Sequence, residues 1–261
     1  METRFVKSSD GASIAYDVSG SGPALILLHG GFVKGKQSWH EAGYVEQLSK
    51  DFTVIAVDLR GHGESDKPVT VEAYGVQILM DDVEAVADAC GANDFSIWGF
   101  SYGATIALHL AASSRRVTKA VIAGSMFGQI FPEGYIESLV SEMELIAVAQ
   151  EEGRLDELSL SPERQSFIAD NSLRVVIASM GAMASWPPVE PRDLLCPALV
   201  LAGSKNFPVA SALASRGEEI KAAGVELRIF DGLDHFQEFS ETEILLPPVL
   251  SFLLSEMGYI P

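Results

Sequence analysis

Short hydrophobic runs alternate with longer helical patterns along most of this chain. The runs have the length and the β-branched or aromatic content of strands, and they cover residues 4–7, 13–18, 24–28, 52–57, 95–98, 119–123, 198–202 and 226–230. Asp10-Gly11 lies between the first two runs and favours a tight hairpin. The middle runs are apolar on both faces, as strands buried between two helix layers must be.

Four segments between the strands repeat apolar residues at helical spacing: 71–89, 102–113, 211–223 and 245–257. Gly91 and Gly224 follow two of them, and glycine is common just past the end of a helix. The alternation of strands and helices predicts an α/β fold with a largely parallel sheet and helices on both of its faces.

One connection interrupts this alternation. From Ser125 to Arg192, about 68 residues contain no convincing strand. The segment is helical in character, with one helix expected over 134–151 and another after Ser161, where Ser supplies the N-cap and Pro162 the first helical position. Because so long a connection is rarely a bare loop, we expect a helical cap over the sheet.

This interruption predicts the domain organisation. Residues 1–124 and 193–261 form the two parts of an α/β core, and residues 125–192 form the cap between them. We expect one domain with an insertion, since 261 residues suit that arrangement better than two independent units.

The charge of the chain limits its partners. The 36 acidic residues outnumber the 18 basic ones, which gives a net charge of −18, while 48% of the residues are hydrophobic, enough for a core. So acidic a surface repels phosphate backbones and anionic lipid head groups. We therefore expect no nucleic-acid and no membrane partner, but a small-molecule substrate, with the chain as a monomer or homodimer.

Other features point to a reducing compartment and a site without metal or cofactor. Cys90 and Cys196 stand far apart, neither in a CxxC pair nor beside a histidine. The N-terminal residues lack the apolar segment of a secretory signal, so we expect a cytoplasmic protein. No His/Asp/Glu set has metal-ligand spacing, and no phosphate-binding glycine motif is present, so we expect no metal and no cofactor.

The motif with the clearest chemistry is Gly99-Phe100-Ser101-Tyr102-Gly103. It fits the G-x-S-x-G pattern, in which a serine occupies a sharp turn between a buried strand and a helix. Small residues two positions on either side let the strand and the helix approach each other closely. The turn exposes the serine oxygen at the carboxyl edge of the sheet and at a helix N-terminus. We therefore predict that Ser101 is a nucleophile.

An oxyanion-binding turn is also predicted. Acyl transfer needs two preorganised N–H donors for the oxyanion of its tetrahedral intermediate. One is expected from the amide of Tyr102, the residue after the nucleophile. The other is expected from the turn His29-Gly30-Gly31-Phe32 after a central strand, with Gly31 as the donor and Phe32 as the alternative.

The base is predicted to be His235. It is the only one of five histidines that follows the last strand, where a base belongs if the chain order is Ser, acid, His. His109 lies about two helical turns beyond Ser101 and points away from the edge. His29 and His62 lie in glycine-rich loops, where we expect them to hold the backbone.

With these motifs in place, the sequence resembles the α/β-hydrolase family over nearly its whole length. The landmarks are His29-Gly30-Gly31, the run from Asp58 to Ser65, the serine turn, the turn from Gly203 to Pro208, and Asp234-His235. The resemblance implies an eight-stranded, mostly parallel sheet with a helical cap inserted after the sixth strand. Halide-displacing members carry Asp at the nucleophile position, so Ser101 disfavours that chemistry.

The sequence departs from the family at the triad acid. The resemblance implies a carboxylate three positions after Gly203, but Asn206 occupies that position. The acid holds the imidazole in the tautomer that accepts the serine proton, and the equivalent Asp-to-Asn change in a serine protease lowers kcat by about four orders of magnitude. Three explanations for Asn206 stay open. It inactivates the enzyme but preserves substrate binding, it works as an Asn within the triad, or the protein binds a ligand without hydrolysing it.

Three other carboxylates are candidates for this role. Asp193 precedes the seventh strand, at the wrong end of the sheet, and Asp234 is badly placed to bridge its own neighbour's ring. Asp231 is the best remaining candidate. If Asn206 occupies the triad, Asn206→Asp should be faster by orders of magnitude, whereas equal and substantial rates would point to Asp231.

The predicted cap supplies the hints about substrate. Aromatic and methionine side chains concentrate there and are typical both of a cap core and of an apolar pocket: Phe127, Phe131, Tyr135, Met143, Met180, Met183 and Trp186. Lys34 and Lys36 bring positive charge near the expected entrance and could orient an anionic substrate.

The sequence therefore favours a serine hydrolase that cleaves a small, mainly apolar ester, thioester or lactone through an acyl-enzyme. Two alternatives stay open. One is a ligand-binding or sensing protein on a hydrolase scaffold. The other is a C–C bond hydrolase or lyase that uses the same site.

Overall fold

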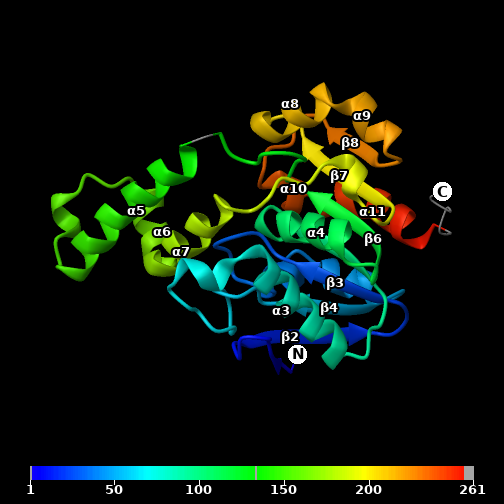
Figure 1. Ribbon diagram of the computed structural model, residues 1–261, viewed down its shortest axis with the longest axis horizontal. Coiled ribbons are helices and arrows are strands. Elements are labelled where there is room, and N and C mark those ends of the chain that lie inside the picture. Colours follow the sequence, from blue (N-terminus) through cyan, green and yellow to red (C-terminus); the bar gives the residue numbers. More distant parts are fainter. Residues whose placement is uncertain (1, 133, 256–261) are drawn as a thin grey trace.

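A central sheet organises the computed structural model, which describes residues 2–132 and 134–255 (Figure 1). Its eight strands are β1 (Arg4–Lys7), β2 (Ser13–Gly20), β3 (Ala24–Leu28), β4 (Thr53–Val57), β5 (Phe95–Phe100), β6 (Val117–Ala123), β7 (Ala198–Gly203) and β8 (Glu226–Phe230). They lie in the order β1-β2-β4-β3-β5-β6-β7-β8. β2 pairs antiparallel with β1 and β4, and every other pairing is parallel. The predicted fold class and the hairpin at Asp10-Gly11 are confirmed.

Helices cover both faces of this sheet. Alternate residues of β5 belong to different cores: Ile97 packs in the cluster that contains residues of α3 (Val76–Ala89) and α4 (Tyr102–Ser113). Trp98 packs in the cluster with residues of α2 (Tyr44–Leu48) and α11 (Thr242–Leu254). The two-residue period of a strand thus divides its side chains between the two layers. All six residues of β5 are buried, as are all six of β7.

The helices agree with the sequence prediction in position more than in continuity. The predicted helix over 71–89 is a 3-10 turn (Val71–Tyr74) followed by α3, with extended backbone at Gly75 between them. The predicted helix over 211–223 is two helices, α8 (Phe207–Ser215) and α9 (Gly217–Ala222), that break at Arg216. Residues 256 and 257 of the last predicted helix lie outside the described residues. The short helices α1 (Gln37–Glu41), α2 and α10 (Gln237–Ser240) were not predicted.

The connection between β6 and β7 is helical. It contains α5 (Tyr135–Glu151), a 3-10 turn (Leu155–Glu157), α6 (Pro162–Asp170), α7 (Leu173–Met183) and a second 3-10 turn (Pro191–Asp193). The Ser161 side chain accepts a hydrogen bond from the Arg164 amide at 3.2 Å, as the capping pattern predicts. These helices extend to one side of the sheet (Figure 1). They have a core of their own, formed by Met143, Ile146, Ala147, Ile168, Leu173 and Val176.

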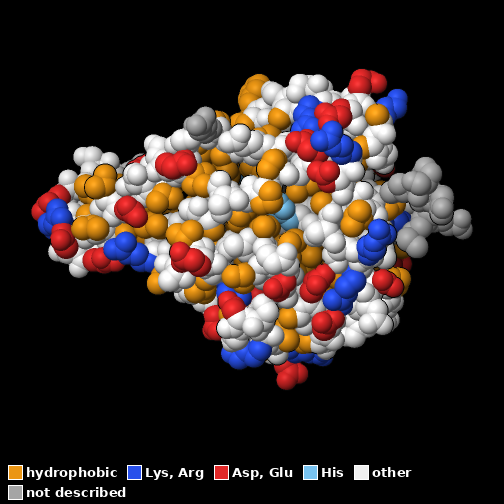
Figure 2. All heavy atoms as spheres, viewed as in Figure 1, with side chains coloured by type: hydrophobic (Ala, Val, Ile, Leu, Met, Phe, Trp, Pro, Cys, Tyr) orange, Lys and Arg blue, Asp and Glu red, His pale blue; other side chains and the backbone are white. Residues whose placement is uncertain are grey.

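The acidic side chains are spread over the surface. On the face in Figure 2, Asp and Glu lie at many separate places, several of them beside Lys or Arg. Among the described residues, no helix combines the length and the apolar character that a membrane span requires.

Candidate active site

Ser101 occupies a strained turn between β5 and α4. Its backbone has φ of 52° and ψ of −112°, and a positive φ is rare for a residue with a side chain. The Ser101 amide donates to the Ala123 carbonyl at 2.8 Å, and Thr105 N donates to the Ser101 carbonyl at 3.0 Å. These bonds fix the turn at the carboxyl edge of the sheet, where the serine oxygen emerges.

The two glycines of the motif permit this turn. A Cβ at Gly99 would lie 2.3 Å from the Gly103 carbonyl oxygen, and one at Gly103 would lie 2.4 Å from the Leu28 carbonyl oxygen. Neither position can hold a side chain without moving backbone. The expectation that small residues let the strand and the helix approach is confirmed.

His235 lies within hydrogen-bond distance of Ser101. The distance from His235 Nε2 to Ser101 Oγ is 3.0 Å, although 134 residues separate them in the chain. The imidazole stacks on the ring of Phe100, with centroids 5.1 Å apart and planes 25° apart. The contact with Phe100 and the bonds at Nδ1 hold the ring in the plane that directs Nε2 to Ser101.

Two side chains meet the other nitrogen of this ring. His235 Nδ1 lies 3.0 Å from Glu238 Oε2 and 3.0 Å from Asn206 Nδ2. Asn206 Nδ2 also lies 3.0 Å from each oxygen of Glu238. The sequence prediction thus placed Asn206 beside the base correctly but missed Glu238, the carboxylate in the same contact.

Glu238 is held inside the protein. Its side chain is 1% exposed, and its Oε1 accepts a hydrogen bond from the Gly203 amide at 2.5 Å. It belongs to α10, which begins directly after the loop of His235, and its amide donates to the Asp234 carbonyl. The only sequence signal is the spacing of three residues between His235 and Glu238, which puts both on one side of a helical turn.

The other carboxylates that the sequence suggested lie elsewhere. Asp231 is exposed and accepts a hydrogen bond from the Ser204 hydroxyl at 3.1 Å. Asp234 accepts the amides of Phe236 and Gln237. Asp193 lies in the 3-10 turn before β7 and accepts the amide of Glu190. The prediction of Asp231 as the substitute acid is wrong, because its carboxylate is bonded to the neighbouring loop and Glu238 contacts the ring.

The two candidate donors in the predicted oxyanion turn, Gly31 and Phe32, differ in their hydrogen bonding. The Phe32 amide donates to His62 Nε2 at 2.9 Å, so it is already engaged, and its φ is 58°. Among the described residues, the amides of Gly31 and Tyr102 have no acceptor. The α-carbon of Gly31 faces Tyr102, since a Cβ there would lie 3.5 Å from that of Tyr102. Gly31 and Tyr102 therefore remain the pair of free donors, and the alternative of Phe32 is wrong.

Two histidines hold the loops behind this turn. His29 Nδ1 lies 2.6 Å from the Gly30 carbonyl, and its Nε2 accepts the Leu59 amide at 2.9 Å. Burial, with His62 nearby, lowers the pKa of His29 to about 3. His62 Nδ1 faces the Arg60 carbonyl at 3.1 Å, and burial lowers the pKa of His62 as well. Both rings are neutral and bind backbone, as expected from the sequence.

The two lysines near this loop do not face the serine turn. Lys36 Nζ lies 2.6 Å from Asp58 Oδ2 and 3.0 Å from Glu64 Oε1, with its side chain 9% exposed. Lys34 is exposed and pairs with Glu41 at 3.1 Å. Lys34 is solvated, whereas Lys36 is buried. Both ammonium groups already pair with carboxylates, which disfavours a role in orienting an anionic substrate.

The aromatic and methionine side chains of the helical insertion lie in different surroundings. Phe127 packs in a core on the sheet, and Tyr135 is half exposed. Met143 and Met180 pack in the insertion's own core. Phe131, Met183 and Trp186 line a cavity of about 470 Å³ together with His109. Neither Ser101 nor His235 lines this cavity. Its connection to the serine turn is indirect, through the Trp186 ring, which lies 5.7 Å from that of Tyr102.

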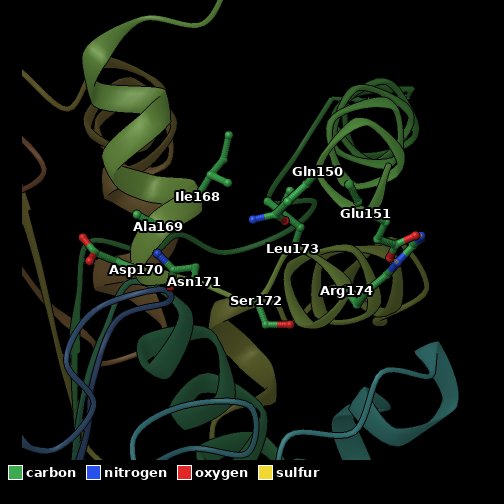
Figure 3. Close-up of a pocket in the computed structure, with 10 residues that line it drawn as sticks. Gln150, Glu151, Ile168, Ala169, Asp170, Asn171, Ser172, Leu173 and Arg174 are labelled. Atoms are coloured by element: carbon green, nitrogen blue, oxygen red, sulfur yellow. Dashed lines mark hydrogen bonds and ion pairs between the residues drawn. The ribbon is translucent and has the colours of Figure 1, made fainter. Parts of the chain in front are cut away.

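A second cavity lies within the insertion. It has a volume of about 370 Å³. In Figure 3, Asp170 and Asn171 lie on one side of it, and Gln150 and the Glu151–Arg174 ion pair lie on the other. Its lining includes neither Ser101 nor His235. It is therefore separate from the residues that carry the predicted chemistry.

Comparison with known proteins agrees with this geometry. Residues 23–135 match the family described as alpha/beta hydrolase fold. A soluble epoxide hydrolase from Corynebacterium sp. (strain C12) is 31% identical over 126 residues, which is 48% of this chain and 42% of that enzyme. The chain spans less than half the length of this relative and of two other curated relatives that it matches.

Solved structures match over nearly the whole chain. A hydrolase from Pseudomonas aeruginosa PA01 has a TM-score of 0.77 at 24% identity, covering 97% of this chain and 99% of that one. The esterase RhEst1 from Rhodococcus sp. ECU1013 has a TM-score of 0.70 at 26% identity, covering 99% and 100%. With the sheet order, the helical insertion after β6 and the turn at Ser101, these matches show that the chain has the α/β-hydrolase fold.

Proposed function

We propose that this protein is a serine hydrolase that cleaves a small, mainly apolar ester, thioester or lactone. The observation that carries the proposal is the 3.0 Å contact between His235 Nε2 and Ser101 Oγ at a strained turn. A nucleophile and a base in this geometry, with two free amides beside them, are the requirements of acyl transfer.

The reaction proceeds in two halves. Ser101 Oγ attacks the carbonyl carbon while His235 Nε2 takes the hydroxyl proton, and the amides of Gly31 and Tyr102 bind the oxyanion that forms. The carbon–leaving-group bond then breaks, and the leaving group takes the proton from His235. Water attacks the acyl-enzyme with His235 again as base, which releases the acid and restores the Ser101 hydroxyl.

The nucleophile favours acyl substrates over epoxides, although a relative is named as an epoxide hydrolase. Attack of a serine oxygen on an epoxide carbon would form an ether, which has no carbonyl for water to attack. Attack on an acyl carbon forms an ester, which water hydrolyses by the same oxyanion chemistry. Similarity to an esterase from Rhodococcus supports the same choice.

The helical insertion supplies the apolar surroundings of the substrate in this proposal. It acts as a cap, and it carries aromatic and thioether surface at Trp186 and Met183, of which the Trp186 ring lies 5.7 Å from that of Tyr102. Both lysines are neutralised elsewhere, which favours an uncharged acyl group.

The proposal is tested with p-nitrophenyl acetate and butyrate and with a fluorophosphonate that labels activated serines. The protein should hydrolyse both esters and gain one phosphonyl group on the peptide that contains Ser101. Ser101→Ala should lose the label and lower kcat by at least about 10³-fold.

Undiminished turnover by Ser101→Ala would contradict the proposal. Binding of the esters with neither turnover nor labelling would favour the ligand-binding alternative. Hydrolysis of styrene oxide in place of the esters would contradict the proposal and favour the chemistry for which the epoxide hydrolase relative is named.

A further inference from the structure

We propose that Glu238, three residues after the base, supplies the carboxylate that orients His235, while Asn206 holds that carboxylate from the usual position of the acid. This inference rests on the proposed serine-hydrolase function. Its basis is the convergence of His235 Nδ1, Asn206 Nδ2 and the Gly203 amide on one buried carboxyl group. Glu238 is a positioning residue, since it acts through His235 and touches no reacting atom.

The direction of each hydrogen bond follows from the task of the imidazole. To accept the Ser101 proton, His235 must leave Nε2 unprotonated and carry its proton on Nδ1. An N–H at Nδ1 needs an acceptor, and Glu238 Oε2 lies 3.0 Å away. When His235 takes the serine proton, the same carboxylate lies beside the positive charge that forms on the ring.

Asn206 cannot serve as that acceptor in this arrangement. Its Nδ2 faces both oxygens of Glu238 at 3.0 Å, where only a donor is compatible with a carboxylate. If the amide were rotated so that its oxygen faced Nδ1, that oxygen would lie against Glu238 oxygens with no proton between them. The amide therefore donates to Glu238. With the proton on Nδ1, the 3.0 Å contact between Asn206 Nδ2 and His235 Nδ1 joins two donors that share the Glu238 carboxylate and is not a hydrogen bond.

The surroundings are built to hold a carboxylate at this point. Burial of a charged group is costly unless hydrogen bonds replace its water, and Glu238 has three donors for two oxygens. Gly124 gives it room, because a Cβ there would lie 2.8 Å from Glu238 Oε2. The loop after β6 thus leaves space for the carboxyl group that comes from α10.

A role limited to anchoring the loop at Gly203 would use the same buried carboxylate, so the test separates the two roles. Glu238→Gln keeps the size of the side chain but leaves the amide and imidazole donors short of acceptors. We expect kcat on p-nitrophenyl acetate to fall by about 10²- to 10⁴-fold while KM changes by less than about threefold.

The decisive variant exchanges the two groups. In Asn206→Asp/Glu238→Gln, the new carboxylate at position 206 can accept from Nδ1, and the new amide at position 238 can accept from Gly203 and donate to that carboxylate. The double variant should regain at least about tenfold in kcat over Glu238→Gln. If Glu238 only anchored the loop at Gly203, the double variant should show no recovery. The carboxylate at position 206 would then meet Nδ1 without replacing the anchor.

The single variant Asn206→Asp gives an independent outcome that does not depend on Glu238→Gln folding. It places two carboxylates about 3 Å apart, where they repel each other, so kcat should not rise. An increase of orders of magnitude would overturn the inference and identify residue 206 as an impaired acid position. Asp231→Asn, whose carboxylate is exposed and bonded to Ser204, is the matched control and should stay within about twofold of the parent.

A failure of this inference is distinguishable from a failure of the proposed function. The tautomer of His235, read from imidazole ¹⁵N shifts, does not require turnover. A proton on Nδ1 in the parent that is lost in Glu238→Gln supports the role of Glu238 even if no ester is cleaved. If the parent cleaves esters and Glu238→Gln keeps both this turnover and the same tautomer, the role of Glu238 is overturned. The hydrolase proposal is then left intact.

Discussion

The geometry of this site depends on a glycine at position 124, where any side chain would crowd the imidazole and the carboxylate. The φ of Gly124 is +70°, and a Cβ would lie 2.8 Å from Glu238 Oε2 and 3.0 Å from His235 Cε1. The glycine follows β6 and has no chemical role of its own. It leaves the volume in which the imidazole and the carboxylate meet.

Gly124→Ala should therefore impair catalysis beyond its effect on stability. We expect kcat/KM for p-nitrophenyl butyrate to fall by about tenfold to 10²-fold. The added methyl group would push His235 and Glu238 aside and misalign the imidazole with Ser101. Gly224→Ala is the control, since its φ is +75° with nothing within 4 Å of the added Cβ. Both variants should lose similar stability in urea, and equal activity in the two would refute the crowding argument.

The residues of the site differ in how far the sequence predicts them. Ser101 and His235 could be predicted, because the strand, the serine turn and the order along the chain are local patterns. Glu238 could not, because its burial depends on Gly203 and Gly124, which approach it only in the folded chain. The choice of Gly31 over Phe32 depends on a bond to His62, thirty residues away.

At the level of elements, length decided what could be predicted. The strands and α4 are long enough to show their period, and the structure reproduces them within a few residues. α10 has four residues, about one turn, so no period can appear. That short helix carries Glu238, whose carboxylate contacts His235. α8 begins at Phe207, four residues before the predicted helix, and the single non-helical residue Arg216 separates it from α9.

The helical insertion has a small core of its own, although α7 also places Val175, Ala178 and Ala182 in one of the cores on the sheet. Ile168 lies in that core with 5% exposure, and its neighbours there come from α5, α6 and α7. Phe32 makes a link to the site, because its ring lies 5.8 Å from that of Phe167 in α6. A defect in this core should loosen the insertion before it affects the sheet.

Ile168→Ala tests this separation. The cavity should cost about 2–5 kcal/mol within the insertion, so trypsin should cut at Arg154 or Arg164 several times faster than in the parent. The urea transition followed by the buried Trp39 and Trp98 should stay nearly unchanged. Leu145→Ala, at a side chain that is 73% exposed, should change neither. A lower urea midpoint without faster cleavage would argue for one cooperative unit.

At the scale of the whole molecule, buried neutral histidines make stability depend on pH. Burial lowers the pKa of His29 to about 3 and that of His109 to about 4. In the unfolded chain both titrate at about 6.5. Between these values the unfolded chain binds more protons than the folded one, so the free energy of unfolding falls as the pH falls.

Urea unfolding at pH 7, 6 and 5 measures this effect. Below a pH of ~6.5, each histidine lowers the free energy of unfolding by up to about 1.4 kcal/mol for each pH unit. Above that pH, this stability is fully present. His62, whose pKa burial also lowers, acts in the same direction. His109→Phe removes one of these three histidines and should make the decline between pH 6 and 5 shallower. Asp10, whose pKa is lowered to about 2 by Arg60, loses its contribution only below about pH 4 and does not interfere. Parallel declines in parent and variant would exclude His109 as a source.

The bridge at the base of the insertion has a consequence for how this chain can change. The Gly128 amide donates to the Val189 carbonyl at 2.8 Å, so the chain leaves and re-enters the core at nearly the same point. Ser101, the amides of Gly31 and Tyr102, and Gly124 precede that point, and His235 and Glu238 follow it. The intervening residues enter the fold as one continuous segment, so a change in the length of this segment leaves the chain connections of these groups unaltered.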